Sequence, residues 1–273
     1  MVRPVQRDED RRQIIALLPG EFRRIFHPPF EVLVCLVANG LLAAVLWYYS
    51  PIELVNLVFT FHISFLFPTV LATWMLADVP ATNQLAPDPA HVLDRLDDPT
   101  SITELLRAKQ IALWLLTTPV ALIVAVLIGA VDHLWLSLAM TAIWVAIVPL
   151  AGLGLSCFVG VRWPYHPIPL KARWAQIHGE RRRLLRWGVL VLVPYVLVPA
   201  LGAIALIPPG IAWEIAGGPT LSKAVDNVSI LFGACVSIPV SILLFRWGTR
   251  RAGRLAHERR DRLRAYLSDP SLG

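Results

Sequence analysis

Long stretches of apolar residues alternate with shorter polar and charged segments along the whole chain. A helix needs about 20 apolar residues to cross roughly 30 Å of membrane hydrocarbon, and six stretches approach that length. Because backbone polar groups in lipid must be satisfied within each segment, the pattern predicts an all-α polytopic membrane protein with six transmembrane helices. The predicted spans are Val32–Tyr49, Leu54–Leu76, Ile111–Val131, Leu134–Val161, Gly188–Ile207 and Val228–Phe245.

The polar segments between these spans are too short to form a soluble domain of ordinary size. We therefore expect a single membrane domain over residues 1–273, with a cytoplasmic or interfacial segment (1–29), a six-span bundle (30–245) and a basic cytoplasmic tail (246–273). Hydrophobic residues make up 56% of the chain and charged residues 16%. Lipid must be the solvent for much of this apolar surface.

Positive charge is distributed unevenly along the chain. Every lysine and arginine except Lys223 lies in the N-terminal segment, in the connections after the second and fourth spans, or in the tail. The positive-inside rule then places both termini in the cytoplasm and the chain in the plasma (inner) membrane. The net charge of +6 reflects topology and not nucleic-acid binding, because the arginines flank apolar stretches. Membrane lipid is a predicted partner and nucleic acid is not.

The N-terminal segment has apolar residues at helical spacing, surrounded by arginines, which predicts a helix in the membrane interface. Pro19 and Gly20 are expected to break this helix into two pieces, and Pro28 with Pro29 to turn the chain into the membrane. Two interpretations stay open: a tail attracted to anionic lipid, and an elbow helix that packs on the bundle. The apolar positions are Ile14, Leu18, Phe22, Ile25 and Phe26.

The connection after the second span contains two helix-start signals. Asp88 followed by Pro89 predicts the N-cap and first turn of a short helix. Ser101 with Glu104 fits a capping box, so a second helix is expected to begin there and continue as a stalk into the third span. Ordering a short helix below the membrane costs conformational entropy, which favours a partner docked on it. A solvated acidic loop is the alternative.

Two further connections leave alternatives open. Arg162–Arg186 begins with a proline-rich aromatic run and continues into a basic stretch, which is typical of a headgroup anchor. A second partner contact is the other interpretation. The connection 207–226 contains proline and glycine around an apolar patch and forms either a re-entrant piece or a plain loop.

Catalytic chemistry has no support in the sequence. A Walker A motif needs Gly-Lys, and no lysine follows a glycine, so the chain is not expected to hydrolyse ATP. We predict no catalytic, cofactor-binding or metal-ligating residue and no enzyme activity. The three cysteines lie in apolar stretches, where they act as small hydrophobic residues. His62 in the second span could line a pathway, but a hydrogen bond to a neighbouring helix is the alternative.

Two local stretches suggest a family. Leu96-Asp-Asp-Pro99-Thr-Ser101-Ile-Thr-Glu-Leu105-Leu106-Arg-Ala-Lys109 resembles the pattern of Leu, Pro, Ser, a Leu pair and Lys that precedes the third span of ABC-2-type permeases. Ser156 to Pro169 is similar to the Ser and Pro-Tyr-Pro stretch that ends their fourth span. The layout of the whole chain also resembles these membrane subunits of ATP-binding cassette exporters.

The resemblance implies a function for the short helix. Pro89 to Asp97 would be a coupling helix in a groove of a separate ATPase subunit, which would bind the ATP, so the chain itself needs no cofactor. Two permease copies, or one copy and a paralogue, would form the translocation path at their interface. A secondary transporter and a non-transporting membrane scaffold stay open as alternatives. The implied coupling residues are Pro89, His91, Val92, Asp94, Arg95 and Asp97.

Overall fold

Every regular element in the described part of the chain is an α-helix, as the sequence predicts. The computed structural model describes residues 4–28, 30–49, 63–77, 79–132, 135–164, 195–198, 200–202, 204, 207, 211 and 228–269. The helices are α1 (Pro4–Ile25), α2 (Glu31–Tyr49), α4 (Ile63–Met75), α5 (Val79–Thr82), α6 (Pro89–Leu93), α7 (Pro99–Asp132), α8 (Trp135–Arg162), α13 (Val228–Glu258) and α14 (Arg260–Ser268).

Three of these helices are long and apolar enough to cross a membrane. They cover Glu31–Tyr49, Pro99–Val131 and Leu138–Arg162, so they contain the predicted first and third spans and most of the predicted fourth. Helix α4 covers the second half of the predicted second span, and α13 begins at the start of the predicted sixth. Most of the predicted fifth span lies outside the described residues. The membrane character of the chain is therefore supported by three spans among the described helices.

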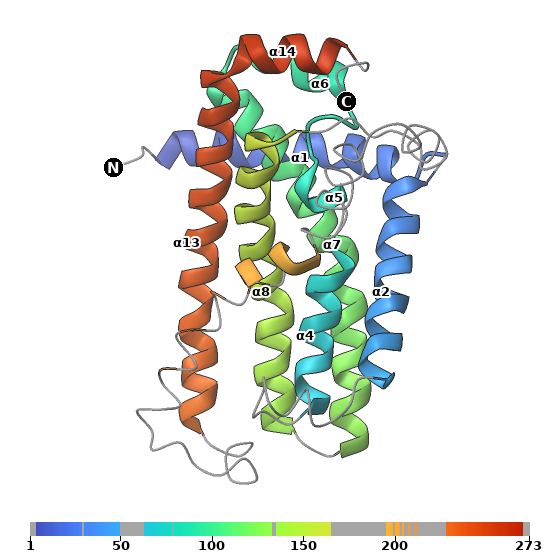
Figure 1. Ribbon diagram of the computed structural model, residues 1–273. Helices are drawn as coiled ribbons and strands as arrows, with labels where there is room; N and C mark the ends of the chain where they lie inside the picture. The colour runs from blue at the N-terminus through green and yellow to red at the C-terminus, as the bar shows by residue number, and fades with distance from the viewer. Residues whose placement is uncertain are drawn as a thin grey trace.

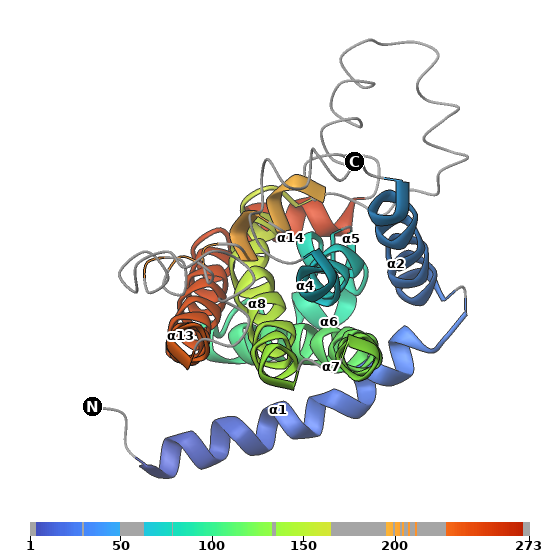
Figure 2. The same cartoon turned by 90° about the horizontal axis from the view of Figure 1, so that it is seen from below.

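The long helices lie side by side, and the short ones gather at one end of the bundle. Figure 1 shows α2, α4, α7, α8 and α13 running lengthwise, with α5, α6 and α14 at the upper end. Helix α1 runs across that end, so the first and last described helices, α1 and α14, both lie there (Figure 1). Viewed along the bundle, α1 passes along one side and leads into α2 at its far end (Figure 2).

Helix α1 differs from the prediction because it is one continuous helix and Pro19 lies inside it. Proline removes one backbone hydrogen bond and usually kinks a helix, but contacts on both sides of it can hold the helix together. After the proline, Glu21 and Ile25 are buried, and α1 packs mainly against α7. The chain then turns at 26–28, as predicted, and Phe30 adopts a left-handed φ of 57° just before α2.

The start of α7 also corrects the prediction. Its first residue is Pro99, and Asp98 is the residue that caps it: the Asp98 carboxylate accepts hydrogen bonds from the backbone N–H groups of Thr100 and Ser101, each at 3.0 Å. Ser101 and Glu104 therefore lie within the first turns of the stalk and do not form its capping box. The Asp98 carboxylate thus satisfies two of the N–H groups that the first turn of a helix leaves without a partner in the helix. The predicted continuous stalk is confirmed.

Two clusters of buried apolar side chains hold the helices together. One lies within the bundle and joins α2, α4, α7 and α8, with Leu36, Leu71, Leu113 and Leu153 among its members. The other lies at the end that carries α6 and α14, and we call it the end cluster. Its buried members are Leu85, Ala86, Val92, Leu96, Ile102, Leu105, Leu106, Cys157, Val161, Ala252, Ala256, Leu263 and Leu267.

Candidate functional site

The candidate site is built on α6, which begins where the sequence predicts. Pro89 occupies the first turn, where its missing N–H is not needed, and the N–H of Val92 donates to the backbone oxygen of Asp88 (3.2 Å). The helix ends at Leu93 and not at Asp97. Asp94 is its C-cap, and residues 94–97 form a turn that leads directly to the Asp98 cap of α7. The predicted coupling helix is therefore shorter than the segment expected to form it.

Two apolar side chains fix this segment to the rest of the protein. Val92 on α6 and Leu96 in the turn are both fully buried in the end cluster. Burying side chains of this size contributes about 1.5–3 kcal/mol each. They contact α7 from one side, while Leu263 and Leu267 of α14 belong to the same cluster. The segment is thus a fixed part of the fold and not a solvated loop.

Most of the other side chains of the segment face solvent, whereas Leu93 is partly buried against the end cluster. Pro89, His91, Asp94 and Asp97 are exposed, and the His91 side chain is 65% exposed. Arg95 is half-buried because its guanidinium donates to the Ser101 hydroxyl at 3.0 Å. Of the six residues proposed for coupling, Val92 is the one whose side chain is not accessible to a partner.

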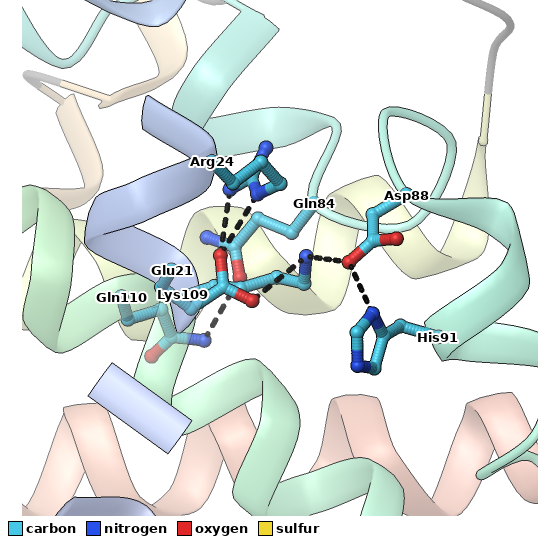
Figure 3. A network of polar contacts seen from close by, with 7 residues as sticks. All are labelled: Glu21, Arg24, Gln84, Asp88, His91, Lys109 and Gln110. Carbon is cyan, nitrogen blue, oxygen red and sulfur yellow. Dashed lines mark hydrogen bonds and ion pairs between the residues drawn. The ribbon is translucent and has the colours of Figure 1, made fainter. Parts of the chain in front are cut away.

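Beneath this segment lies a buried network of charged side chains, drawn in Figure 3. The Nζ atom of Lys109 on α7 lies 3.2 Å from a carboxylate oxygen of Glu21 on α1 and 3.3 Å from one of Asp88. Glu21 also pairs with Arg24 (2.8 Å), and Asp88 with the His91 ring (3.4 Å). The Lys109 side chain is only 2% exposed. Its ion pairs with the two carboxylates offset the free energy that is needed to remove its charge from water. The network joins α1, α6 and α7 at one point.

Asp88 takes part in this network and does not act as a helix cap. Its side chain makes no capping hydrogen bond to α6. Burial acts to raise the pKa of the Asp88 carboxyl, but the Lys109 ammonium with its hydrogen bond and the nearby His91 and Arg24 together lower it by more, so the net pKa lies below its ordinary value. The aspartate is therefore held in its charged form, which keeps the ion pair with Lys109 intact.

A second, uncharged branch extends the network to α13. The Gln110 side-chain amide, fully buried, donates to Gln84 at 3.4 Å and accepts a hydrogen bond from the Thr249 hydroxyl at 2.8 Å. Gln84 in turn donates to the backbone oxygen of Ala81 on α5 (3.1 Å). Consecutive residues of α7, Lys109 and Gln110, thus connect that helix to α1, to α13 and to the segment between α5 and α6.

Glu104 gives α1 and α7 a further point of contact. It is buried, and the Gln13 amide, oriented with its nitrogen towards the carboxylate, donates to it at 3.0 Å. The residue expected to cap the stalk therefore holds the interfacial helix. This arrangement supports the elbow interpretation of the N-terminal segment, because α1 packs on the bundle.

The C-terminal helix α14 is the part of the site that sequence reasoning missed. It lies beside α6 (Figure 1), and its Arg264 guanidinium contacts both carboxylate oxygens of Asp97 at 3.1 and 3.0 Å. A ring nitrogen of His257 lies 3.0 Å from the backbone oxygen of Leu96. The expected basic tail is thus folded against the α6 segment. The signal was present in the four-residue spacing of Leu263 and Leu267, which is typical of an amphipathic helix.

Several predicted features cannot be placed. His62 lies outside the described residues, as do most of the connections 162–186 and 207–226. In the described part of the chain, no group of three or more His, Cys, Asp or Glu side chains could hold a metal ion. The site consists of ion pairs and hydrogen bonds that connect the α6 segment to several helices.

Comparisons with protein-family models, with curated proteins and with solved structures find no match to this chain.

Proposed function

We propose that the chain is the membrane-spanning permease subunit of an ABC exporter, and that a separate ATPase subunit drives it through alternating access. The observation that carries the proposal is the position of α6. This helix exposes Pro89, His91 and Asp94 at one end of the bundle, while Asp88 beside it is ion-paired to Lys109 within the network. A partner that moved α6 would therefore act on α7 through packed contacts and ion pairs.

The arrangement of the helices supports six spans. Helices α8 and α13 run towards the same end of the bundle (Figure 1), so the chain between them has to return to the opposite end. A fifth span, as the sequence predicts, would provide that return. Helices α1, α6 and α14 lie at the arginine-rich end, which the positive-inside rule would place in the cytoplasm, where an ATPase could reach it.

ATP would bind only to the partner subunit. Closure of two ATPase subunits around ATP would favour one arrangement of two permease copies, or of this chain and a paralogue, and release would favour the other. The translocation path would form at the interface of the two permeases. The ATPase subunits can shift the permeases only by as much free energy as they gain from binding one arrangement more tightly than the other. Helix α6 would be the point of contact through which this preference acts.

Charge reversal at one exposed aspartate tests the docking. Asp94 is exposed and belongs to the α6 segment, whereas Asp97 already pairs with Arg264, so Asp94→Arg is the cleaner variant. The tagged full chain, extracted from its native membrane, should co-purify with an ATPase that contains a Walker A motif. Asp94→Arg should reduce this recovery at least ten-fold, because reversing a charge at an interface costs several kcal/mol.

Asp261→Arg is the matched control, since Asp261 is an exposed aspartate on the neighbouring α14. This variant should recover the ATPase as well as the unchanged chain does. Absence of any ATPase would contradict the proposal and favour a scaffold or a secondary transporter. Equal recovery with Asp94→Arg would place the docking surface elsewhere.

The orientation has its own test. Ala90→Cys, in a background without Cys35, Cys157 and Cys235, places a thiol on the exposed part of α6. A membrane-impermeant maleimide should label this thiol in inverted vesicles and not in intact cells. Labelling from outside the cell would exclude a cytoplasmic ATPase as the partner of α6.

A further inference from the structure

The upper part of α13 carries a dense group of arginines that the end cluster and the charged network do not use. Arg246, Arg250, Arg251 and Arg254 are all exposed, and none of them forms an ion pair with another residue that the structure describes. The helix contains no acidic residue before Glu258, its last residue. Such an unneutralised group of cations is a site for an anionic partner.

These arginines follow the apolar part of the helix at the depth of the lipid headgroups. A span of about 20 residues that begins at Val228 ends close to Trp247. Leu243 and Trp247 are 64% and 56% exposed, and they lie four residues apart on one face of the helix. Arg250, Arg251 and Arg254 continue this face by one and two turns. Along this face of α13, an aliphatic group is followed by an indole and then by guanidinium groups. This order matches the change from acyl chain to headgroup in a lipid.

The end of α8 extends the same surface. Phe158 contacts Trp247, with ring centroids 6.2 Å apart, and the Arg259 guanidinium donates to the backbone oxygen of Arg162 at 3.3 Å. Because Arg162 follows Phe158 by four residues and Arg251 follows Trp247 by four, both arginines lie on the cytoplasmic side of the aromatic pair. Arg162 is exposed. The two helices thus form one surface with rings on its membrane side and guanidinium groups above them.

We propose that this α8–α13 surface binds the headgroup of an anionic phospholipid, with Arg162 and Arg251 on the phosphate and Trp247 against the upper acyl chain. Guanidinium groups bind phosphate through paired N–H donors, and the lack of acidic neighbours leaves them available. The site is distinct from the α6 segment and does not depend on the proposed ATPase.

Spin-labelled phosphatidylglycerol and phosphatidylcholine provide the test. The full chain is reconstituted in phosphatidylcholine vesicles with each probe, and electron paramagnetic resonance measures the immobilised fraction at the protein surface. Each arginine near an anionic surface contributes about 1 kcal/mol, so Arg162→Gln with Arg251→Gln should weaken binding of phosphatidylglycerol about 30-fold relative to phosphatidylcholine. Replacement of both residues by lysine should retain most of the preference.

Arg260→Gln with Arg262→Gln is the control, because it removes two exposed arginines from α14 and leaves the α8–α13 surface intact. This variant should keep the preference for phosphatidylglycerol. An equal loss in the control would show that net charge alone attracts the lipid, and the proposal would fail. It would also fail if the Arg162 and Arg251 variant kept its preference, or if inorganic phosphate alone displaced the probe, which would indicate a site for a free anion.

Discussion

Gly248 on α13 lies directly against the backbone of Gly154 on α8. A Cβ atom added at Gly248 would overlap the backbone carbonyl of Gly154, and one added at Gly154 would lie 2.9 Å from the backbone oxygen of Phe245. The two helices can approach this closely only because both residues lack a side chain. Small residues at helix crossings are a common basis for helix association in membranes, where apolar burial gives little driving force.

Alanine at this crossing should therefore push α8 and α13 apart. Gly154→Ala and Gly248→Ala are each expected to destabilise the protein by about 1–3 kcal/mol, seen as a lower midpoint of thermal unfolding in detergent. Gly20→Ala is the control, because a Cβ there meets no atom within 4 Å. That variant should be neutral or stabilising by up to about 1 kcal/mol, since alanine favours helix. An unchanged unfolding midpoint for Gly248→Ala would contradict the close backbone contact between Gly248 and Gly154.

Lys109 should be among the most sensitive positions of the charged network. Lys109→Met removes the buried cation and leaves the carboxylates of Glu21 and Asp88 without it, at a cost of about 3–5 kcal/mol. Adding Asp88→Asn should recover part of that loss, because one buried charge is then removed as well. The measurement is the unfolding midpoint of the two single variants and the double variant. Additive effects would show that the two side chains do not interact.

The lowered pKa of Asp88 predicts how the stability of the protein changes at acid pH. A carboxyl whose pKa is lower in the folded state stabilises that state fully above its unfolded pKa, here about 3.8, and loses this contribution as pH falls through the lower folded value. The unchanged protein should therefore be more stable than Asp88→Asn at pH 6. The difference between the two should be constant down to about pH 5 and shrink below pH 4. A difference that grows on acidification would have the wrong sign.

Variants of Asp98 and Ser101 should show which of the two residues caps the start of α7. Asp98→Ala should cost about 0.5–2 kcal/mol, because it removes the acceptor for the N–H groups of Thr100 and Ser101. Ser101→Ala loses only the hydrogen bond from Arg95 and should cost less. Urea unfolding of both variants in the same detergent provides the comparison. A larger effect for Ser101→Ala would restore the capping box that the sequence pattern suggested.

The Asp98 cap shows how local reasoning can identify an element and still assign its end incorrectly. Both Asp98-Pro99 and the Ser101 and Glu104 pair are valid start signals, and they lie three residues apart. In the structure the Asp98 carboxylate accepts hydrogen bonds from the N–H groups of Thr100 and Ser101, and Glu104 is buried beside Gln13 of α1. Hydropathy and length identified the three long apolar helices of the described residues, because those properties belong to each segment alone.

The charged network could not be predicted for a related reason. Lys109 and Asp88 are 21 residues apart, and nothing in the local pattern pairs them with each other or with Glu21. In the sequence, Lys109 was a positive charge near a span and the last residue of the stretch that resembles the permease pattern, and neither feature indicates a buried ion pair. Its burial follows from α1 crossing the end of the bundle, and that crossing depended on Pro19 not breaking the helix.

Removal of the leucine contacts of α14 should affect α6 as well, because Leu263 and Leu267 share the end cluster with Val92. Leu263→Ala and Leu267→Ala should each weaken the docking of α14 by about 2–5 kcal/mol. Amide hydrogen exchange should then speed up both in α14 and in residues 89–97, with little change in α2. Arg262→Ala, at an exposed position of the same helix, should leave exchange unchanged. If α14 exchanged faster while residues 89–97 kept their protection, the tail would not be part of what holds α6 in place.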